Sequence, residues 1–329
     1  MIDLAAAQHV AARLRDRLTA AVKGRDDVIE LVLVALLADG HVLLEDYPGS
    51  GKTLLSKTLG ESIIDDGADH IPGFRRIQFT PDLLPSDVTG VTVFDATTSR
   101  FSFRAGPVFA HVVLADEINR TSPKVQAALL EAMAEKQVTV DNTTWKLDEL
   151  FFVIATQNPL DLAGTYPLPV AQLDRFLFKI RMHHVSREAE LDVLLTAKER
   201  RAGVPEALPR ASRGEVVAAR QACHELVHVS RSVHEALVDV ARALRADRRV
   251  LQGASTRSLV MALPALQARA MIRGRDYVTP DDVEALLVPI FGHRLELAPG
   301  VDDAGEVIHE GAMPVLERLA RLSLERAAG

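Results

Sequence analysis

The chain has 329 residues, of which 48% are hydrophobic, and this composition suits two globular domains rather than a disordered or fibrous protein. A formal net charge of −7 argues against a surface that is basic throughout, so a nucleic-acid partner is a secondary hypothesis. The single cysteine, Cys223, permits no disulfide within the chain, and we expect a small core or surface residue rather than a reactive thiol.

The N-terminal residues have the pattern of an amphipathic helix. Residues 1–17, MIDLAAAQHVAARLRDR, lack the uninterrupted apolar core of a signal peptide. The most apolar stretch, VIELVLVALLADGHVLL at 28–44, is interrupted by Glu30, Asp39 and Gly40, so it predicts a buried helix that leads into a strand. We therefore expect a cytoplasmic protein without stable membrane insertion.

The next segment, LLEDYPGSGKTLL at 43–55, is similar to the phosphate-binding loop of nucleotide hydrolases. Gly51, Lys52 and Thr53 fit the pattern G-x-x-x-x-G-K-[ST], whereas Asp46 stands at the first glycine position. In such a loop, backbone N–H groups wrap the phosphates, the lysine reaches the outer phosphates and the hydroxyl helps to hold Mg²⁺. A strand-like run precedes the loop and helical leucine spacing follows it, as the motif requires. Gly-Ser-Gly-Lys also occurs in ordinary turns, so partners elsewhere must decide.

Asp46 is compatible with ATP binding on physical grounds. Aspartate tolerates positive φ better than most residues other than glycine. A carboxylate roughly 6 Å from one phosphate charge costs about 0.7 kcal/mol at the dielectric constant of water and about 3 kcal/mol at an effective value of 20. The loop amides, Lys52 and Mg²⁺ oppose this repulsion. We expect ATP binding to survive in weakened form, with the Asp46 side chain turned away from the phosphates.

Short apolar runs between helical or loop segments predict a parallel sheet that is covered on both faces. The runs are HVLLE (41–45), RIQF (76–79), HVVLA (111–115) and LFFVIAT (150–156). Two other stretches, VTVFDATTSRFSF (91–103) and QVTVDNTTWKL (137–147), alternate around a polar turn and predict β-hairpins. One interpretation of each hairpin is an edge hairpin with only a structural role.

The predicted strand at 111–115 leads into two carboxylates, Asp116 and Glu117. Ligands of open α/β sheets bind at the carboxyl ends of the strands. In a phosphate-loop enzyme, the first acid would hold Mg²⁺, usually through water, and the second would orient or deprotonate the attacking water. Taken alone, the two acids would equally suit a solvated strand end, but the upstream loop favours the catalytic interpretation. Ser122 and Pro123 then predict the start of a helix.

Polar residues at three later positions suit phosphate chemistry. Asn158 follows the predicted strand at 150–156, where an amide would sense the γ-phosphate and fix the water nucleophile. Arg175 lies in YPLPVAQLDRFLF, and Arg257 lies in the first turn of a helix predicted to begin at Ser255. A planar, permanently charged donor stabilises charge that develops on phosphate oxygens. Either arginine would equally serve in a surface salt bridge.

The patterning changes near residue 185, after which the chain is predicted to be nearly all helix. The Pro-, Gly- and charge-rich segment at 198–215, KERRAGVPEALPRASRGE, is predicted to be a loop. Another helix is predicted to begin at Thr279 and Pro280.

Together these stretches resemble the MoxR branch of the AAA+ ATPases over nearly the whole chain. The resemblance rests on RIQFTPDLLPSDVTG, AGPVFAHVVLADEINRTSPKVQAALLEAM, ATQNP, GTYPLPVAQLDRFLF, and GASTRS followed by RGRDYVTPDDV, in the order that this family shows. It implies an α/β P-loop NTPase (AAA+) core with a parallel sheet and β-hairpin insertions, followed by an all-α lid domain. We place the core at 1–184 and the lid at 185–329.

The resemblance also implies roles for individual residues. The residues implied to bind ATP are Gly49, Ser50, Gly51, Lys52, Thr53 and Leu54. Thr53 and Asp116 are implied to hold Mg²⁺. The residues implied to act in catalysis are Glu117, Asn158 as sensor 1, Arg175 as an arginine finger and Arg257 as a sensor-2 arginine.

The implied assembly is a homo-oligomeric ring, usually a hexamer, with the hairpins projecting towards the ring face or pore. The implied activity is ATP hydrolysis coupled to chaperone-like remodelling of a client protein, often alongside a von Willebrand factor A domain protein. One alternative is a nucleotide-gated scaffold with little turnover, which Asp46 motivates. A nucleic-acid-associated motor is a further alternative, which the acidic balance disfavours.

The sequence departs from the family pattern at two positions besides Asp46. Val170 stands where an acidic residue is common, which would weaken a subunit contact beside the arginine finger. Arg25 replaces a usual glutamine near the expected adenine pocket. Neither change removes a catalytic group.

One motif points to a different chemistry. His224, Glu225 and His228 have the H-E-x-x-H spacing of zinc peptidases on a helix face. The only acid at a suitable distance downstream, Asp247, lies in a charged segment that is better interpreted as a helix end. We therefore favour an ordinary helical segment over a zinc site.

Overall fold

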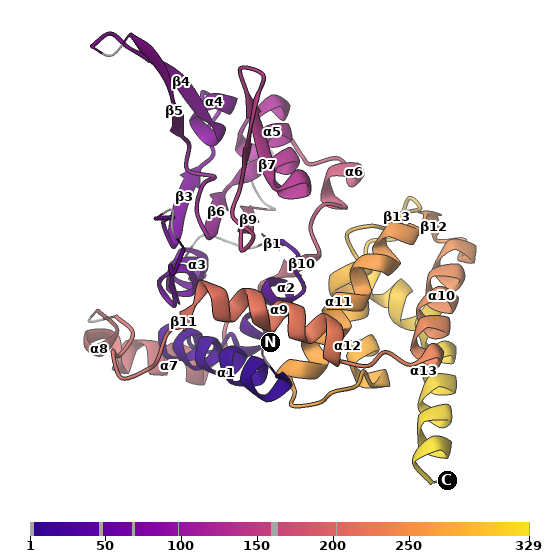
Figure 1. The fold of residues 1–329 in the computed structure, drawn as a ribbon. Coiled ribbons are helices and arrows are strands. Elements are labelled where there is room, and N and C mark those ends of the chain that lie inside the picture. The colour runs from indigo at the N-terminus through magenta and orange to yellow at the C-terminus, as the bar shows by residue number, and fades with distance from the viewer. Residues whose placement is uncertain are drawn as a thin grey trace.

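The computed structural model describes residues 3–45, 49–67, 70–97, 99–158, 164–201 and 203–328. Figure 1 shows a sheet-containing part, from which two hairpins extend, and a helical C-terminal part beside it. In the part of the chain that the structure describes, no helix is both long enough and apolar enough to cross a membrane.

Five parallel strands form the central sheet, in the order β10-β1-β9-β6-β3. In that order, the strands are β10 (Phe178–Arg181), β1 (Val42–Glu45), β9 (Phe152–Gln157), β6 (Val112–Asp116) and β3 (Phe74–Gln78). The four predicted runs are therefore confirmed as strands. β10 was not among the predicted strands, because two of its four residues, Lys179 and Arg181, are charged and it does not form an apolar run.

Successive residues of the inner strands enter two separate cores, since side chains of a strand alternate between faces. On one face, Val112 and Leu114 pack in the core that contains α1, α2, α3 and several C-terminal helices. On the other face, Val113 and Ala115 pack against α4 and α5. The helices named here are α1 (Leu4–Ala21), α2 (Asp26–Leu37), α3 (Lys52–Glu61), α4 (Pro85–Thr89) and α5 (Pro123–Glu135).

Both predicted hairpins are confirmed, and they project from the same end of the sheet (Figure 1). Their strands are β4 (Gly90–Asp95) with β5 (Arg100–Ala105), and β7 (Gln137–Val140) with β8 (Thr143–Lys146). Phe103 of β5 stacks on Trp145 of β8, with ring centroids 4.4 Å apart, and so joins the two hairpins. Phe94 and Phe101 contact each other and are 53% and 73% exposed.

Helices dominate the chain after β10, as predicted. They are α7 (Arg187–Leu195), α8 (Ala197–Arg201), α9 (Arg213–Leu226), α10 (Arg231–Ala246), α11 (Thr256–Ile272), α12 (Pro280–Phe291) and α13 (Ala304–Ala328). Short elements complete the fold: the helical turns η1 (Ile118–Arg120) and α6 (Val170–Leu173), and the strand pairs β2 (Ile63–Ile64) with β11 (Ala211–Ser212) and β12 (Val250–Gln252) with β13 (Glu296–Leu297).

The predicted helix starts are confirmed by their caps. Ser255 caps α11 and accepts a hydrogen bond from the Ser258 N–H, and Thr279 caps α12. The prediction of a loop over 198–215 was wrong in part, since this segment contains most of α8, all of β11 and the start of α9. A capping box between Ser212 and Glu215 starts α9 there, and the composition of the segment obscured this local signal.

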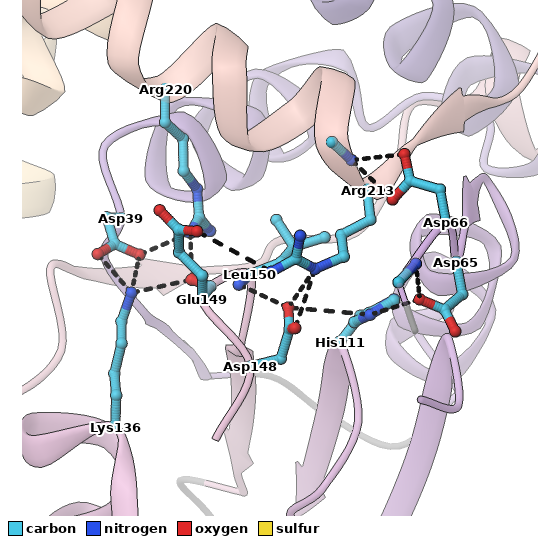
Figure 2. Close-up of polar contacts among 12 residues, drawn as sticks. Asp39, Asp65, Asp66, His111, Lys136, Asp148, Glu149, Leu150, Arg213 and Arg220 are labelled. Atoms are coloured by element: carbon cyan, nitrogen blue, oxygen red, sulfur yellow. Dashed lines mark hydrogen bonds and ion pairs between the residues drawn. The ribbon is translucent and has the colours of Figure 1, made fainter. Parts of the chain in front are cut away.

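Ion pairs fasten α9 to the edge of the sheet where the strands begin (Figure 2). The Arg220 guanidinium is buried, and its Nη1 donates to Oδ1 of Asp39 at 2.7 Å and to the carbonyl oxygen of Glu149 at 2.9 Å. The Arg213 Nε donates to both carboxylate oxygens of Asp148, at 3.0 and 2.9 Å. Although α9 follows residue 185, it is therefore bonded directly to the α/β part.

Candidate functional site at the carboxyl edge of the sheet

The phosphate-binding loop leads from β1 to the first turn of α3. Gly49 and Gly51 have φ angles of 90° and 91°, in the left-handed region that favours glycine. Gly51 caps α3, and Lys52 and Thr53 occupy its first turn. The N–H groups of a helix N-terminus favour bound phosphate. Asp46 lies outside the described residues, so the orientation expected for its side chain stays a prediction.

An open cavity of about 530 Å³ lies at the carboxyl edge of the sheet. Its lining residues are Gly49, Ser50, Gly51, Lys52, Thr53, Leu54, Arg76, Gln78, Asp116, Glu117, Thr156, Gln157 and Asn158. The structure thus brings together all the residues predicted to bind ATP, both predicted acids and the predicted sensor amide. This edge is where ligands of open α/β sheets bind.

Asp116 ends β6 and is held by two neighbouring strands. Its Oδ1 accepts a hydrogen bond of 2.7 Å from the Thr156 hydroxyl of β9. Its Oδ2 accepts two hydrogen bonds from Arg76 of β3, at 3.1 Å from Nε and 2.6 Å from Nη2. Asp116 is buried, with a side chain only 13% exposed, so its position is well defined.

Glu117 has a backbone conformation that a non-glycine residue rarely adopts, with φ 58° and ψ 50°. Its N–H donates to the Thr156 hydroxyl oxygen at 2.9 Å. Its Oε2 accepts a hydrogen bond of 3.1 Å from Gln78 and lies 3.1 Å from the Arg120 Nε. Glu117 thus lines the cavity at the end of β6.

Charged residues near the start of the loop hold Glu45 at the end of β1. Burial acts to raise the pKa of Glu45, but hydrogen bonds from Lys179 and Gln157 and the nearby Arg181 outweigh burial and lower it. The Gln157 amide nitrogen donates to Glu45 at 2.7 Å. Gln157 is therefore hydrogen-bonded to Glu45 beside the loop. The next residue, Asn158, lines the cavity.

The donor set of the cavity fits Mg²⁺. Thr53 and Asp116 supply hard oxygen atoms in one cavity, and Mg²⁺ commonly takes one or two protein oxygens together with substrate phosphates and water. Such a site needs no dense cluster of ligands. The described residues contain no group of three or more His, Cys, Asp or Glu side chains arranged as metal ligands.

Neither of the two predicted arginines is among the described residues that line the cavity. Arg257 Nε is 3.9 Å from Oδ2 of Asp174, whose Oδ1 accepts a 2.7 Å hydrogen bond from the buried Arg294. Arg175 follows Asp174 directly and donates to the carbonyl oxygen of Leu130 at 2.7 Å. Arg257 is thus held near Asp174, Arg175 is held against α5, and both lie outside the cavity lining.

A second cavity of about 500 Å³ shares four loop residues with the first. Arg25 lines it, and the expectation that it lies near the adenine stays a prediction. The Arg25 side chain is buried and donates to the carbonyl oxygen of His183.

Four residues in direct contact with the acids had no predicted role: Arg76, Gln78, Arg120 and Thr156. Arg76 and Gln78 lie two residues apart in β3, so they point to one side of an edge strand. Two long polar side chains at alternate positions near a strand end are a weak signal. Only the neighbouring strand shows what they bind.

The H-E-x-x-H interpretation fails in the fold. Helix α9 ends at Leu226, and His228 follows in a segment whose backbone pairs with Tyr277, so His224 and His228 do not share a helix face. Cys223 is buried, and burial raises the pKa of its thiol to about 12. It is therefore a core residue, as predicted.

Known proteins match the chain along most of its length. Residues 41–178 match the family described as "ATPase family associated with various cellular activities (AAA)", and residues 242–310 match the AAA lid domain. The chain is 48% identical to Uncharacterized protein YeaC of Bacillus subtilis, with 84% of this chain and 83% of that protein covered. It is 39% identical to Chaperone MoxR1 of Mycobacterium tuberculosis, with 89% and 78% covered. A crystal structure of a candidate ATPase from Cytophaga hutchinsonii is 33% identical, with a TM-score of 0.82 and 96% of both chains covered.

The parallel sheet, the glycine loop and the paired acids define a P-loop ATPase of the AAA class with a helical lid, which confirms the predicted fold class. The similarity to MoxR proteins over most of the chain identifies the family within this class of ATPases. The chain belongs to the MoxR family of AAA+ ATPases, and ATP hydrolysis is its activity.

Proposed function

We propose that this ATPase works as a homo-oligomeric ring, a hexamer, and uses hydrolysis to remodel a client protein. The observation that carries the ring is that Arg175 and Arg257 are not among the described residues lining the cavity that holds the loop and the acids. Cations placed in this way suit the γ-phosphate of a neighbouring subunit, since an arginine finger can act in trans. Each active site is then completed at an interface.

Within one subunit, we assign each residue of the cavity a step. The loop amides and Lys52 would bind the phosphates, and Thr53 and Asp116 would hold Mg²⁺. When bound, Mg²⁺ neutralises charge on the β- and γ-phosphate oxygens. Glu117 accepts a proton from the attacking water, and Asn158 orients that water against the γ-phosphate.

The hairpins provide the surface proposed to contact the client. Phe94 and Phe101 expose large apolar area at the end of the β4–β5 hairpin, which is costly in water unless it contacts a partner. The name of the relative Chaperone MoxR1 supports a chaperone-like role. A von Willebrand factor A domain protein is the proposed client class, and the cytoplasm, where ATP is available, is the proposed location. The proposed division into a core at 1–184 and a lid at 185–329 belongs to the same scheme.

A nucleotide-gated scaffold is the second candidate, and a specific contact favours it. Arg76 pairs with Asp116, and Arg120 pairs with Glu117, so both acids have cationic partners. If these pairs persisted with nucleotide bound, turnover would be negligible. A measured steady-state rate separates this candidate from the remodelling ATPase. A nucleic-acid motor ranks below both because the net charge is −7.

A pull-down tests the proposed function. The Glu117→Gln variant should hold the ATP-bound ring and retain client proteins with ATP, and it should release them with ADP. Lys52→Ala, which weakens ATP binding, is the matched control. Mass spectrometry identifies the retained proteins, and analytical ultracentrifugation reports the size of the assembly. Identical sets from the two variants, or a monomer with saturating ATP, would overturn the proposal.

A further inference from the structure

Edge strand β3 places an arginine against the acid that is proposed to hold the metal. Gln78 pairs in register with Asp116, and Arg76 lies two residues earlier on the same face of β3. The Arg76 Nη2 bridges Oδ2 of Asp116 and Oε1 of Gln78, with both distances at 2.6 Å. Gln78 donates in turn to Glu117 at 3.1 Å. A chain of hydrogen bonds thus runs from one acid through Arg76 to the other.

These contacts occupy most of the Asp116 carboxylate. An ionised carboxylate has about four lone-pair sites, two on each oxygen. Two N–H groups of Arg76 fill those of Oδ2, and the Thr156 hydroxyl fills one on Oδ1. Neither Mg²⁺ nor a water molecule that it orients can use Oδ2 while Arg76 stays in this position.

We propose that Arg76 is a counter-ion that competes with Mg²⁺ for Asp116 and leaves this carboxylate when Mg²⁺ and ATP bind together. The inference rests on the proposed role of Asp116 in holding Mg²⁺. Arg76 neutralises Asp116 while the metal is absent, and a guanidinium beside the carboxylate repels a divalent cation. Arg76 is therefore a positioning residue that lowers the coupling between Mg²⁺ and ATP.

The position of Arg76 makes displacement feasible. Its side chain is 47% exposed at the edge of the sheet, so leaving Asp116 does not bury an unpaired charge. Arg76 also lines the cavity at the carboxyl edge of the sheet, together with Lys52 and Thr53. Once released from Asp116, the guanidinium stays within the cavity, where phosphate oxygens are alternative acceptors.

Nucleotide binding measures the competition without relying on turnover. A fluorescent ATP analogue is titrated with EDTA present and again with saturating Mg²⁺. The Kd in EDTA divided by the Kd in Mg²⁺ is the coupling ratio between metal and nucleotide. Arg76→Gln removes the charge. Arg76→Met is a second neutral variant, for use if circular dichroism shows that the first is misfolded. Arg76→Lys keeps a charge without the two-donor geometry. Arg75→Gln is the matched control, since Arg75 lies on the opposite face of the same strand.

We expect the coupling ratio of Arg76→Gln to exceed that of the wild-type protein by roughly two- to fivefold, the upper range for a partly exposed ion pair. Arg76→Lys should lie between the two, and Arg75→Gln should match wild type. An unchanged or smaller ratio in both neutral variants would overturn the competition. Wild-type protein that binds no ATP, or binds it equally with and without Mg²⁺, would instead contradict the proposed role of Asp116.

Discussion

The Thr156 hydroxyl is hydrogen-bonded to both acids of the site, Asp116 and Glu117, so its removal tests the geometry of the site. Thr156 is 1% exposed; its Oγ1 donates to Asp116 at 2.7 Å and accepts the Glu117 N–H at 2.9 Å. Thr156→Val keeps the shape of the side chain and removes only these two hydrogen bonds. The Glu117 N–H then loses its acceptor, and Asp116 loses a donor.

The expected loss of stability follows from these two bonds. A hydrogen bond to a charged group contributes about 1.5–3 kcal/mol, and a buried N–H without a partner costs about 1–3 kcal/mol. Because one hydroxyl makes both bonds, the two terms are not additive, and we expect a loss of about 2–4 kcal/mol. Holding Glu117 in its left-handed conformation costs of order 1–3 kcal/mol. By leaving that conformation, Glu117 can recover part of the lost stability.

That relaxation would move the general base, so kcat should fall by roughly 10- to 100-fold while ATP affinity changes little. Urea unfolding gives the stability, phosphate release gives kcat, and fluorescence titration gives the affinity. Thr156→Ser keeps the hydroxyl and is the control. A Thr156→Val protein with wild-type kcat would refute the argument that this hydroxyl positions Glu117.

Four other outcomes are expected. Glu117→Gln should retain ATP but lose at least about a hundredfold in hydrolysis rate, the scale of general-base catalysis, whereas Lys52→Ala should weaken binding; a wild-type rate for Glu117→Gln would contradict its assignment as the base. Asp46→Gly should tighten ATP binding in titrations at fixed Mg²⁺ and two ionic strengths, and unchanged or poorer affinity would give Asp46 a positive role. Mixing inactive Arg175→Ala and Glu117→Gln proteins should restore part of the ATPase activity, because some interfaces then carry an intact arginine and an intact glutamate. If subunits exchange and no activity returns, Arg175 acts in its own subunit or the ring needs every site intact. A dilution series with wild type distinguishes these two cases. Burial lowers the pKa of His41 to about 4, so the stability that its neutral ring provides is complete above pH 6.5 and is lost as the pH falls towards 4. This amounts to about 2 kcal/mol by pH 5, and urea unfolding of His41→Asn should show a flatter pH profile than wild type; equal slopes would assign the acid sensitivity to other groups.

Local signals in the sequence predicted much of this protein. Glycines that need positive φ marked the loop at Gly49 and Gly51, and serine or threonine caps marked the starts of α11 and α12. Four apolar runs predicted four of the five parallel strands, and alternation around a polar turn predicted both hairpins. Each of these features depends on residues close together in the chain, so a single sequence can reveal it.

Only the tertiary structure decided which distant residues meet. β3 lies beside β6, and this strand order brings Arg76 to Asp116 across 40 positions of sequence. The packing of α11 likewise placed Arg257 beside Asp174. A long charged side chain can pair with any acid within its reach, and its own sequence neighbours do not select among them. The choice depends on distances of a few ångströms, which are fixed by the order of the strands and the packing of the helices.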